Sequence, residues 1–143
     1  MTPQELAQAC ADAMWAEDRA SAGLGMAIAR IAPGECDMTM RVEPRMANGH
    51  GICHGGFVFA LADSAFAFAC NSFNRRAVAQ SNSITYLRPA RIGELLTARA
   101  VQTALAGRSG ITDVTVTDAE GRPIAVFRGL SRTIEGQLVE AAA

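Results

Sequence analysis

The alternation of hydrophobic and polar positions is interrupted by a run from Phe57 to Cys70, whose only polar members are Asp63 and Ser64. A run of roughly fourteen residues is too short to cross a membrane and too long for an ordinary strand. Its alanines and Leu61 favour a helix, and small side chains let such a helix lie close to a sheet. We therefore predict one long helix buried in the core.

The segments before this run predict a helix and a hairpin. Thr2-Pro3-Gln4-Glu5 combines an N-cap threonine, a proline at the first helical position and a glutamate placed for a capping box. The helical pattern ends at residues 20–23. Alternation over residues 24–28 and 36–42, around a turn at Pro33-Gly34, predicts a two-stranded hairpin.

Four more strands are expected after the long run, which follows a loop at residues 44–54. The alternating segments are Val78–Leu87, Leu95–Leu105, Ile111–Thr117 and Ile124–Thr133, with turns at Gly107–Gly110 and Asp118–Gly121. We expect an antiparallel meander, and an α+β fold in which an antiparallel sheet wraps around the buried helix. The 143 residues predict a single domain, with an N-terminal helix at 1–22 and the core at 24–135.

Charge and composition exclude several classes of partner. The net charge is −1 and 50% of the residues are hydrophobic, so we expect neither a nucleic acid nor a membrane as partner. All 13 basic residues are arginines. Arginine suits a phosphorylated ligand, although a GC-rich genome explains the absence of lysine at least as well.

The cysteines predict a cytoplasmic protein without a metal site. The four cysteines are widely spaced, and the N-terminus lacks the basic and then apolar pattern of a signal peptide. Cys53 and His54 are adjacent, a spacing that does not ordinarily let a nucleophile face its base. Together with His50 they share one short loop without a second ligand cluster, so we expect neither a thiol nucleophile nor a bound metal.

Asp63 is the candidate for chemistry. A carboxylate in a buried segment is costly unless it is compensated or used, whereas the Ala and Phe positions around it need no function beyond packing. His54-Gly55-Gly56 precedes the run and would expose backbone N–H groups at a helix start, where they can stabilise an oxyanion. A base and an oxyanion hole together suggest acyl-transfer chemistry.

This order of elements, with its glycine pair and acid, resembles the hotdog-fold acyl-CoA thioesterases, most closely the branch found in phenylacetate degradation. The resemblance runs from about residue 24 to residue 133. Its most specific part is residues 48–56, Asn-Gly-His-Gly-Ile-Cys-His-Gly-Gly, continued by Leu61–Ser64 and Ala69–Ser72. Residues 87–90, 107–110 and 127–129 also look like that branch.

The resemblance implies a role for each site residue. It makes Asp63 the catalytic acid, as general base or nucleophile, and the Gly55 N–H the donor to the thioester carbonyl. Asn48 would orient the water or carbonyl, His54 would support the loop, and Ser81 would hold the water near the acid, although Ser83 faces the same way on a strand.

Two further residues are expected to contact the substrate. Gly56 follows the oxyanion donor, and Arg108 lies in a glycine-flanked turn, where it is the first candidate for the phosphates of coenzyme A or else a solvated turn residue. Coenzyme A is part of the substrate, and no cofactor is expected. Because a thiolate with a pKa of about 8.5 leaves easily, no Ser-His-Asp set is needed.

Helix geometry predicts a site shared between two subunits. Asp63 follows Gly55 by eight residues, which is about 12 Å along a helix axis. One chain cannot bring both to one carbonyl, so a two-fold homodimer would form two composite sites. This agrees with the family, whose dimers often pair into a dimer of dimers, a homotetramer.

The substrate follows from the resemblance and two alternatives remain. The branch implies phenylacetyl- or hydroxyphenylacetyl-CoA, and the phenylalanines of the long run could offer an aromatic wall, namely Phe57, Phe59, Phe66 and Phe68. An enoyl-thioester hydratase of the same fold would use an acid and His54. A non-catalytic acyl-CoA-binding protein is the other alternative, but a pure binder would gain nothing from a desolvated Asp63.

Overall fold

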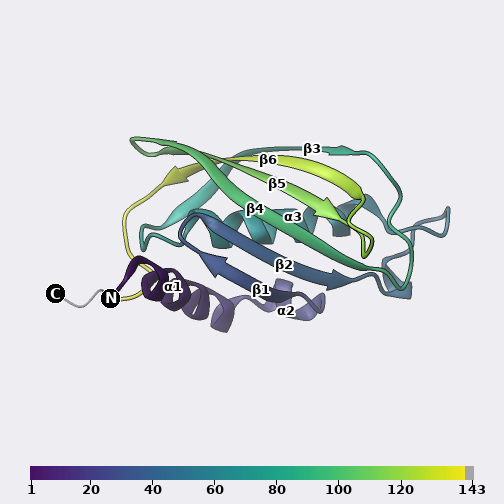
Figure 1. Cartoon of the computed structure of the whole chain (residues 1–143), viewed down its shortest axis with the longest axis horizontal. Helices are drawn as coiled ribbons and strands as arrows, with labels where there is room; N and C mark the ends of the chain where they lie inside the picture. The colour runs from purple at the N-terminus through teal and green to yellow at the C-terminus, as the bar shows by residue number, and fades with distance from the viewer. Residues whose placement is uncertain (141–143) are drawn as a thin grey trace.

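A six-stranded antiparallel sheet curves around one long helix in the computed structural model, which describes residues 1–140 (Figure 1). The first two strands form the predicted hairpin and the others follow the helix in sequence. The strands are β1 (Ala27–Ala32), β2 (Glu35–Arg41), β3 (Ala77–Tyr86), β4 (Leu95–Ala106), β5 (Ser109–Thr117) and β6 (Pro123–Thr133). The predicted α+β arrangement is therefore confirmed.

Helix α3 (Gly55–Cys70) lies in the hollow of the sheet, as the apolar run predicts. Its buried face packs on all the inner strands, and a glycine permits the close approach. A Cβ atom on Gly129 of β6 would come within 2.7 Å of the Phe66 ring. No helix within residues 1–140 is long and apolar enough to cross a membrane.

Two helices precede the sheet. Thr2 caps α1 (Pro3–Glu17) by accepting a 3.1 Å hydrogen bond from the Glu5 N–H. The predicted break at residues 20–23 is instead a short second helix, α2 (Arg19–Gly23). Asp18 is the C-cap of α1 and the N-cap of α2. As N-cap, its carboxylate accepts from the Ser21 N–H at 2.9 Å. A short 3₁₀ turn, η1 (Pro44–Met46), follows the hairpin.

The predicted meander is wrong for β3. The strand order is β1-β2-β4-β5-β6-β3, so only β4, β5 and β6 form a meander, and β3 pairs with β6 instead of β4. Alternation identifies which side chains of a strand face the core, but it carries no information on which strand lies beside it. The connection over residues 87–94 therefore crosses from one side of the sheet to β4.

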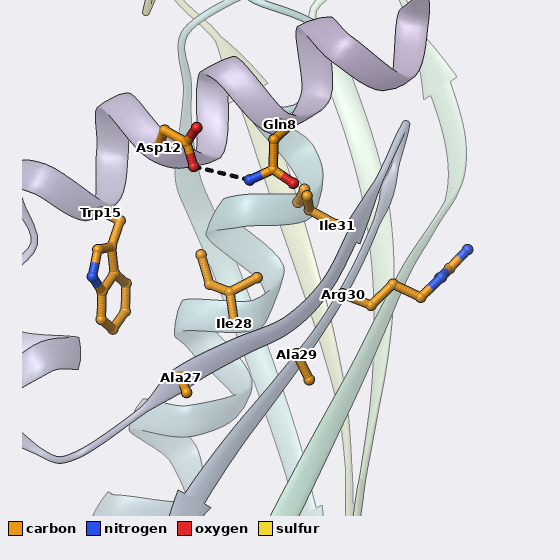
Figure 2. Close-up of a pocket in the computed structure, with 8 residues that line it drawn as sticks. All are labelled: Gln8, Asp12, Trp15, Ala27, Ile28, Ala29, Arg30 and Ile31. Atoms are coloured by element: carbon orange, nitrogen blue, oxygen red, sulfur yellow. Dashed lines mark hydrogen bonds between the residues drawn. The ribbon is translucent and has the colours of Figure 1, made fainter.

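The two edges of the sheet differ. At β1 the Gln4 side-chain amide donates to the Ile31 carbonyl at 2.7 Å, and the register of the strand shifts between Ile28 and Arg30. Helix α1 lies alongside, with Trp15 and Asp12 facing a pocket of about 350 Å³ over the strand (Figure 2). At the other edge, the free side of β3 has no strand partner within residues 1–140.

Candidate functional site

Asp63 lies midway along α3 and is half-buried. The Asn82 side-chain amide, on β3, donates to Asp63 Oδ1 at 3.1 Å. Burial raises the pKa of the carboxyl above its ordinary value of 3.8, and the hydrogen bond from Asn82 opposes that rise. A carboxylate held in this way is poised to accept a proton at a higher pH than an exposed aspartate.

A bulge in β3 decides which side chain meets the acid. The register with β6 shifts between Ala79 and Ser81, so that Ser81 pairs with Leu130 and Asn82 with Gly129. Leu130 is exposed on the outer face of the sheet, whereas Gly129 faces α3. Ser81 therefore points away from Asp63 within the protomer, and the role that the resemblance assigns to it stays a prediction.

The start of α3 presents one free backbone donor. His54 is the N-cap, and its Nδ1 accepts from the Gly56 N–H at 2.9 Å, while the Phe57 N–H donates to the His54 carbonyl at 3.0 Å. The Gly55 N–H has no acceptor within residues 1–140. Gly55 is thus the available oxyanion donor, and the amide of Gly56, expected to contact substrate, is occupied by His54.

Tyr86 holds Gly55 in place. The Tyr86 hydroxyl donates to the Gly55 carbonyl at 2.8 Å, and a Cβ atom added to Gly55 would lie 2.9 Å from the ring carbon Cζ of Tyr86. A side chain at position 55 would therefore displace this ring. Glycine at this position lets the Tyr86 hydroxyl reach the Gly55 carbonyl without such a displacement.

Asn48 lies beside Gly55. Its side-chain oxygen accepts from the His50 N–H at 2.9 Å and so shapes the loop before α3. Asn48 and Gly55 line a common pocket of about 380 Å³, together with Tyr86 and Arg88. The structure brings Asn48 and Gly55 to one pocket, and the role of Asn48 toward the water or carbonyl stays a prediction.

Arg108 lies elsewhere in the protomer. It occupies the turn between β4 and β5, where its carbonyl accepts from the Thr133 N–H at 2.7 Å. It lines a pocket of about 250 Å³ with Arg75 and Glu135. This turn is at the end of the sheet opposite Tyr86 and the start of α3 (Figure 1).

Of the four phenylalanines expected to form an aromatic wall, two are buried in the core and cannot line a substrate site. Phe66 and Phe68 are each 1% exposed, and Phe66 packs in the core with its ring centroid 5.8 Å from that of Phe127. Phe66 follows Asp63 by three residues and so lies next to it on the helix, but its ring packs inward against Gly129 of β6. Phe57 and Phe59 are half-buried and are the only two of the four that retain exposed ring surface.

The thiol next to the site, that of Cys53, is buried. Burial raises the pKa of the Cys53 thiol, which keeps it protonated and unreactive. Within residues 1–140 no three His, Cys, Asp or Glu side chains are placed to hold a metal ion.

Sequence reasoning missed two residues of the site, Asn82 and Tyr86. Both belong to the inward-facing set of β3, which they share with the half-buried Ile84. The signal was present, because an asparagine in line with inward hydrophobic residues needs a buried partner.

Comparisons with known proteins identify the family of the chain. The family model of the Thioesterase superfamily matches residues 50–125. The chain belongs to the thioesterase superfamily. As a thioesterase it is 40% identical over 128 residues to the Escherichia coli K12 protein named acyl-coenzyme A thioesterase PaaI, covering 90% of this chain and 91% of that protein.

Solved structures confirm the hotdog fold of this thioesterase. The structure of the E. coli PaaI protein from the phenylacetic acid degradation operon matches with a TM-score of 0.93 and 38% identity, covering 95% of this chain and 99% of that one. A hypothetical thioesterase from Streptococcus pneumoniae TIGR4, crystallised with coenzyme A, matches with a TM-score of 0.74 and 25% identity, covering 78% and 90%.

Proposed function

We propose that the protein hydrolyses acyl-CoA thioesters, with Asp63 as general base and the Gly55 N–H as oxyanion donor. The observation that carries this proposal is a half-buried carboxylate of raised pKa on the same helix as an unpaired first N–H, in a chain of the thioesterase superfamily. The 40% identity to a protein named acyl-coenzyme A thioesterase supports the choice of thioester.

The reaction needs only these two groups and water. Asp63 takes a proton as the water oxygen bonds to the thioester carbonyl carbon, and the carbonyl oxygen becomes an oxyanion that accepts from the Gly55 N–H. The tetrahedral intermediate collapses, the carbon–sulfur bond breaks, and the thiolate of coenzyme A receives the proton from Asp63. The products are the free acid and coenzyme A.

Asp63 and the Gly55 N–H can act on the same thioester only if they come from two different subunits. In one protomer Asp63 contacts Asn82, whereas Gly55 contacts Tyr86, four residues further along β3. Four residues of a strand span about 13 Å, which matches the estimate from helical rise. We infer that Asp63 of one protomer faces Gly55 of the partner subunit.

The free side of β3 is the edge through which two protomers pair. The β1 edge is blocked by Gln4, its bulge and α1. The free side of β3 has no strand partner within residues 1–140, and only its first residue, Ala77, is bonded by a side chain, that of Asn71. Two antiparallel copies of β3 would join the two sheets and place both copies of α3 on the same side. The α3 surface around Asp63 supports this approach, because its neighbours Gly56, Ala60 and Ala67 are small.

The shared site fixes the register of this pairing. If Asp63 is to face Gly55 of the partner subunit, Asn82 must lie opposite the partner's Tyr86, since these are the strand residues that contact each group. The two-fold axis then passes beside Ile84, midway between positions 82 and 86. A dimer of dimers built from such pairs stays a prediction.

An aromatic acyl group is the proposed substrate class. The support is the relationship to a protein of the phenylacetic acid degradation operon, and the half-buried rings of Phe57 and Phe59 on the helix that carries Asp63. Stacking on such rings is worth about 0.5 to 1.5 kcal/mol beyond the buried area, so straight-chain substrates would be poorer by about tenfold. Arg108 is the proposed contact for the coenzyme A phosphates.

A panel of thioesters tests the function. We expect thiol release from phenylacetyl-CoA and hydroxyphenylacetyl-CoA, with a higher kcat/KM than for hexanoyl-CoA, and no loss of enoyl absorbance with an enoyl-CoA. Water addition to the enoyl group without thiol release would identify a hydratase, against which the engagement of His54 Nδ1 by Gly56 counts. Binding without either reaction would identify a carrier. A clear preference for hexanoyl-CoA would overturn the aromatic assignment alone.

A further inference from the structure

We propose that Asn82 is a positioning residue that holds the Asp63 carboxyl in both of its protonation states; this inference rests on the proposed function. Its side-chain nitrogen donates to Asp63 Oδ1 at 3.1 Å. Its side-chain oxygen is buried and has no hydrogen-bond partner within residues 1–140. Asn82 thus has a donor, its side-chain nitrogen, that is bonded to Asp63, and an acceptor, its side-chain oxygen, that is not bonded within residues 1–140.

The residues around Asn82 direct its side-chain amide toward the Asp63 carboxylate. Its neighbour on β6 is Gly129, which has no side chain, and a Cβ atom at position 129 would have to displace the Phe66 ring. The bulge at Gln80 sets the register that turns Asn82 toward α3. Three local features therefore combine to place one amide against one carboxylate.

The chemistry of a general base requires such a partner. An ionised carboxylate only accepts hydrogen bonds, so it needs the amide nitrogen facing it. After it takes the proton from water it also donates, and it then needs an acceptor until the proton passes to the leaving thiolate. A rotation of the Asn82 side-chain amide exchanges its nitrogen and oxygen, which have nearly the same shape, and supplies that acceptor.

The charged groups of the neighbouring elements do not compete for this role. The pKa of Asp63 has two causes, burial and the bond from Asn82. Cys70, on the same helix, is neutral because burial raises its pKa to about 12. On the elements packed against α3, Arg30 pairs with Glu35, Asp37 with Arg99 and Asp113 with Arg128, and Asp18 accepts from Ser21. No ion pair within residues 1–140 includes Asp63.

Two substitutions of similar size separate positioning from packing. Asn82→Leu removes both donor and acceptor, and Asn82→Asp replaces the donor by a second carboxyl that repels the first. We expect the acid limb of the pH profile of kcat/KM to move up by about one pH unit in Asn82→Leu and further in Asn82→Asp. On the plateau kcat falls by about tenfold in Asn82→Leu while KM changes by less than about twofold.

The controls keep this test decisive. Thr85→Val, on the outer face of the same strand, should leave the profile unchanged, and Asp63→Asn should abolish turnover if the proposed function holds. Wild-type midpoints in both Asn82 variants, or equal loss of rate at every pH, would overturn the positioning role and leave the proposed function standing. If Asn82→Leu does not fold, the midpoint of Asn82→Asp decides, because asparagine and aspartate have the same shape.

Discussion

At the scale of single residues, Asp63 is unusual because its environment penalises its charge. Burial raises its pKa, and one neutral hydrogen bond from Asn82 offsets this only in part. No arginine or lysine within residues 1–140 forms an ion pair with it. If position 63 had only a structural role, an uncharged side chain there would make the folded state more stable.

Asp63→Asn should therefore remove the activity and spare the fold. Loss of a general base typically lowers the rate by about 10²- to 10⁴-fold, whereas the amide preserves the shape of the side chain. Thiol release from phenylacetyl-CoA measures the loss. Asp12→Asn, which neutralises an exposed carboxylate on α1, is the matched control and should retain full activity. A folded Asp63→Asn protein with most of its activity would exclude Asp63 as the base.

The same substitution should change the pH dependence of stability. An acid whose pKa is raised by folding destabilises the folded state when it ionises, so this cost is present above the folded-state pKa and absent below the ordinary value of 3.8. Asp63→Asn should melt roughly 2 °C higher than the wild type at pH 8. The difference should disappear at about pH 3. An equal difference at both pH values would show that ionisation is not its cause.

At the scale of elements, the contact of α3 with the sheet depends on glycine. Gly129 lies on the strand directly over Phe66, and the 2.7 Å approach of a Cβ atom would force the ring or the helix to move. Gly129→Ala should lower the free energy of unfolding by about 1–3 kcal/mol, as other overpacked cores do. Chemical denaturation measures this change.

Gly23→Ala is the control for that measurement. A Cβ atom at Gly23 meets no atom within 4 Å, and the residue lies at the end of α2 without a positive φ. We expect stability to stay the same or to rise by a few tenths of a kcal/mol. Equal effects of the two substitutions would mean that the contact with Phe66 does not limit the packing.

The elements also show where sequence reasoning succeeds and where it ends. The apolar run predicts α3 because burial acts on residues close in sequence, and the capping residues Thr2 and Pro3 predict the start of α1. The place of β3 beside β6 depends on contacts between residues far apart in the chain. A bulge of one residue also changes the faces of β3, so that Asn82 lies beside Asp63, whereas Ser81, which the resemblance places near the acid, faces outward in the protomer.

At the scale of the whole molecule, the proposed composite site makes a prediction about mixtures. Asp63→Asn and Gly55→Val proteins should each be inactive, the second because its side chain would displace the Tyr86 ring and the helix start. In a hybrid dimer one of the two sites has both groups intact. Mixing under conditions of subunit exchange should restore up to about a quarter of the wild-type activity, since about half of the dimers are hybrids with one working site of two.

The control for this experiment is each inactive protein mixed with itself under the same conditions. Subunit exchange is verified independently, by mass spectrometry of differently tagged chains. Exchange without recovery of activity would argue that each site is complete within one subunit.

The register of the proposed β3 pairing can be tested by cross-linking. A cysteine at position 84 lies beside the two-fold axis, opposite its own copy, at the short distance typical of directly facing residues in neighbouring strands. Ile84→Cys should form a covalent dimer on mild oxidation, whereas Ala77→Cys, half-buried on the same face of β3 but far from the axis, should not. The four native cysteines are buried and give little background. The reverse result would require another register or another interface.

The blocked β1 edge limits how many protomers can join edge to edge. A sheet with two open edges adds copies at both sides and grows into a fibre, because each addition leaves a new edge exposed. Here Gln4 occupies a carbonyl of β1 and α1 lies across the strand, so only one side of each protomer can accept a neighbour. If two protomers pair through β3 as proposed, no open sheet edge is left in the dimer. The N-terminal helix, remote from Asp63, would then limit the size of the assembly.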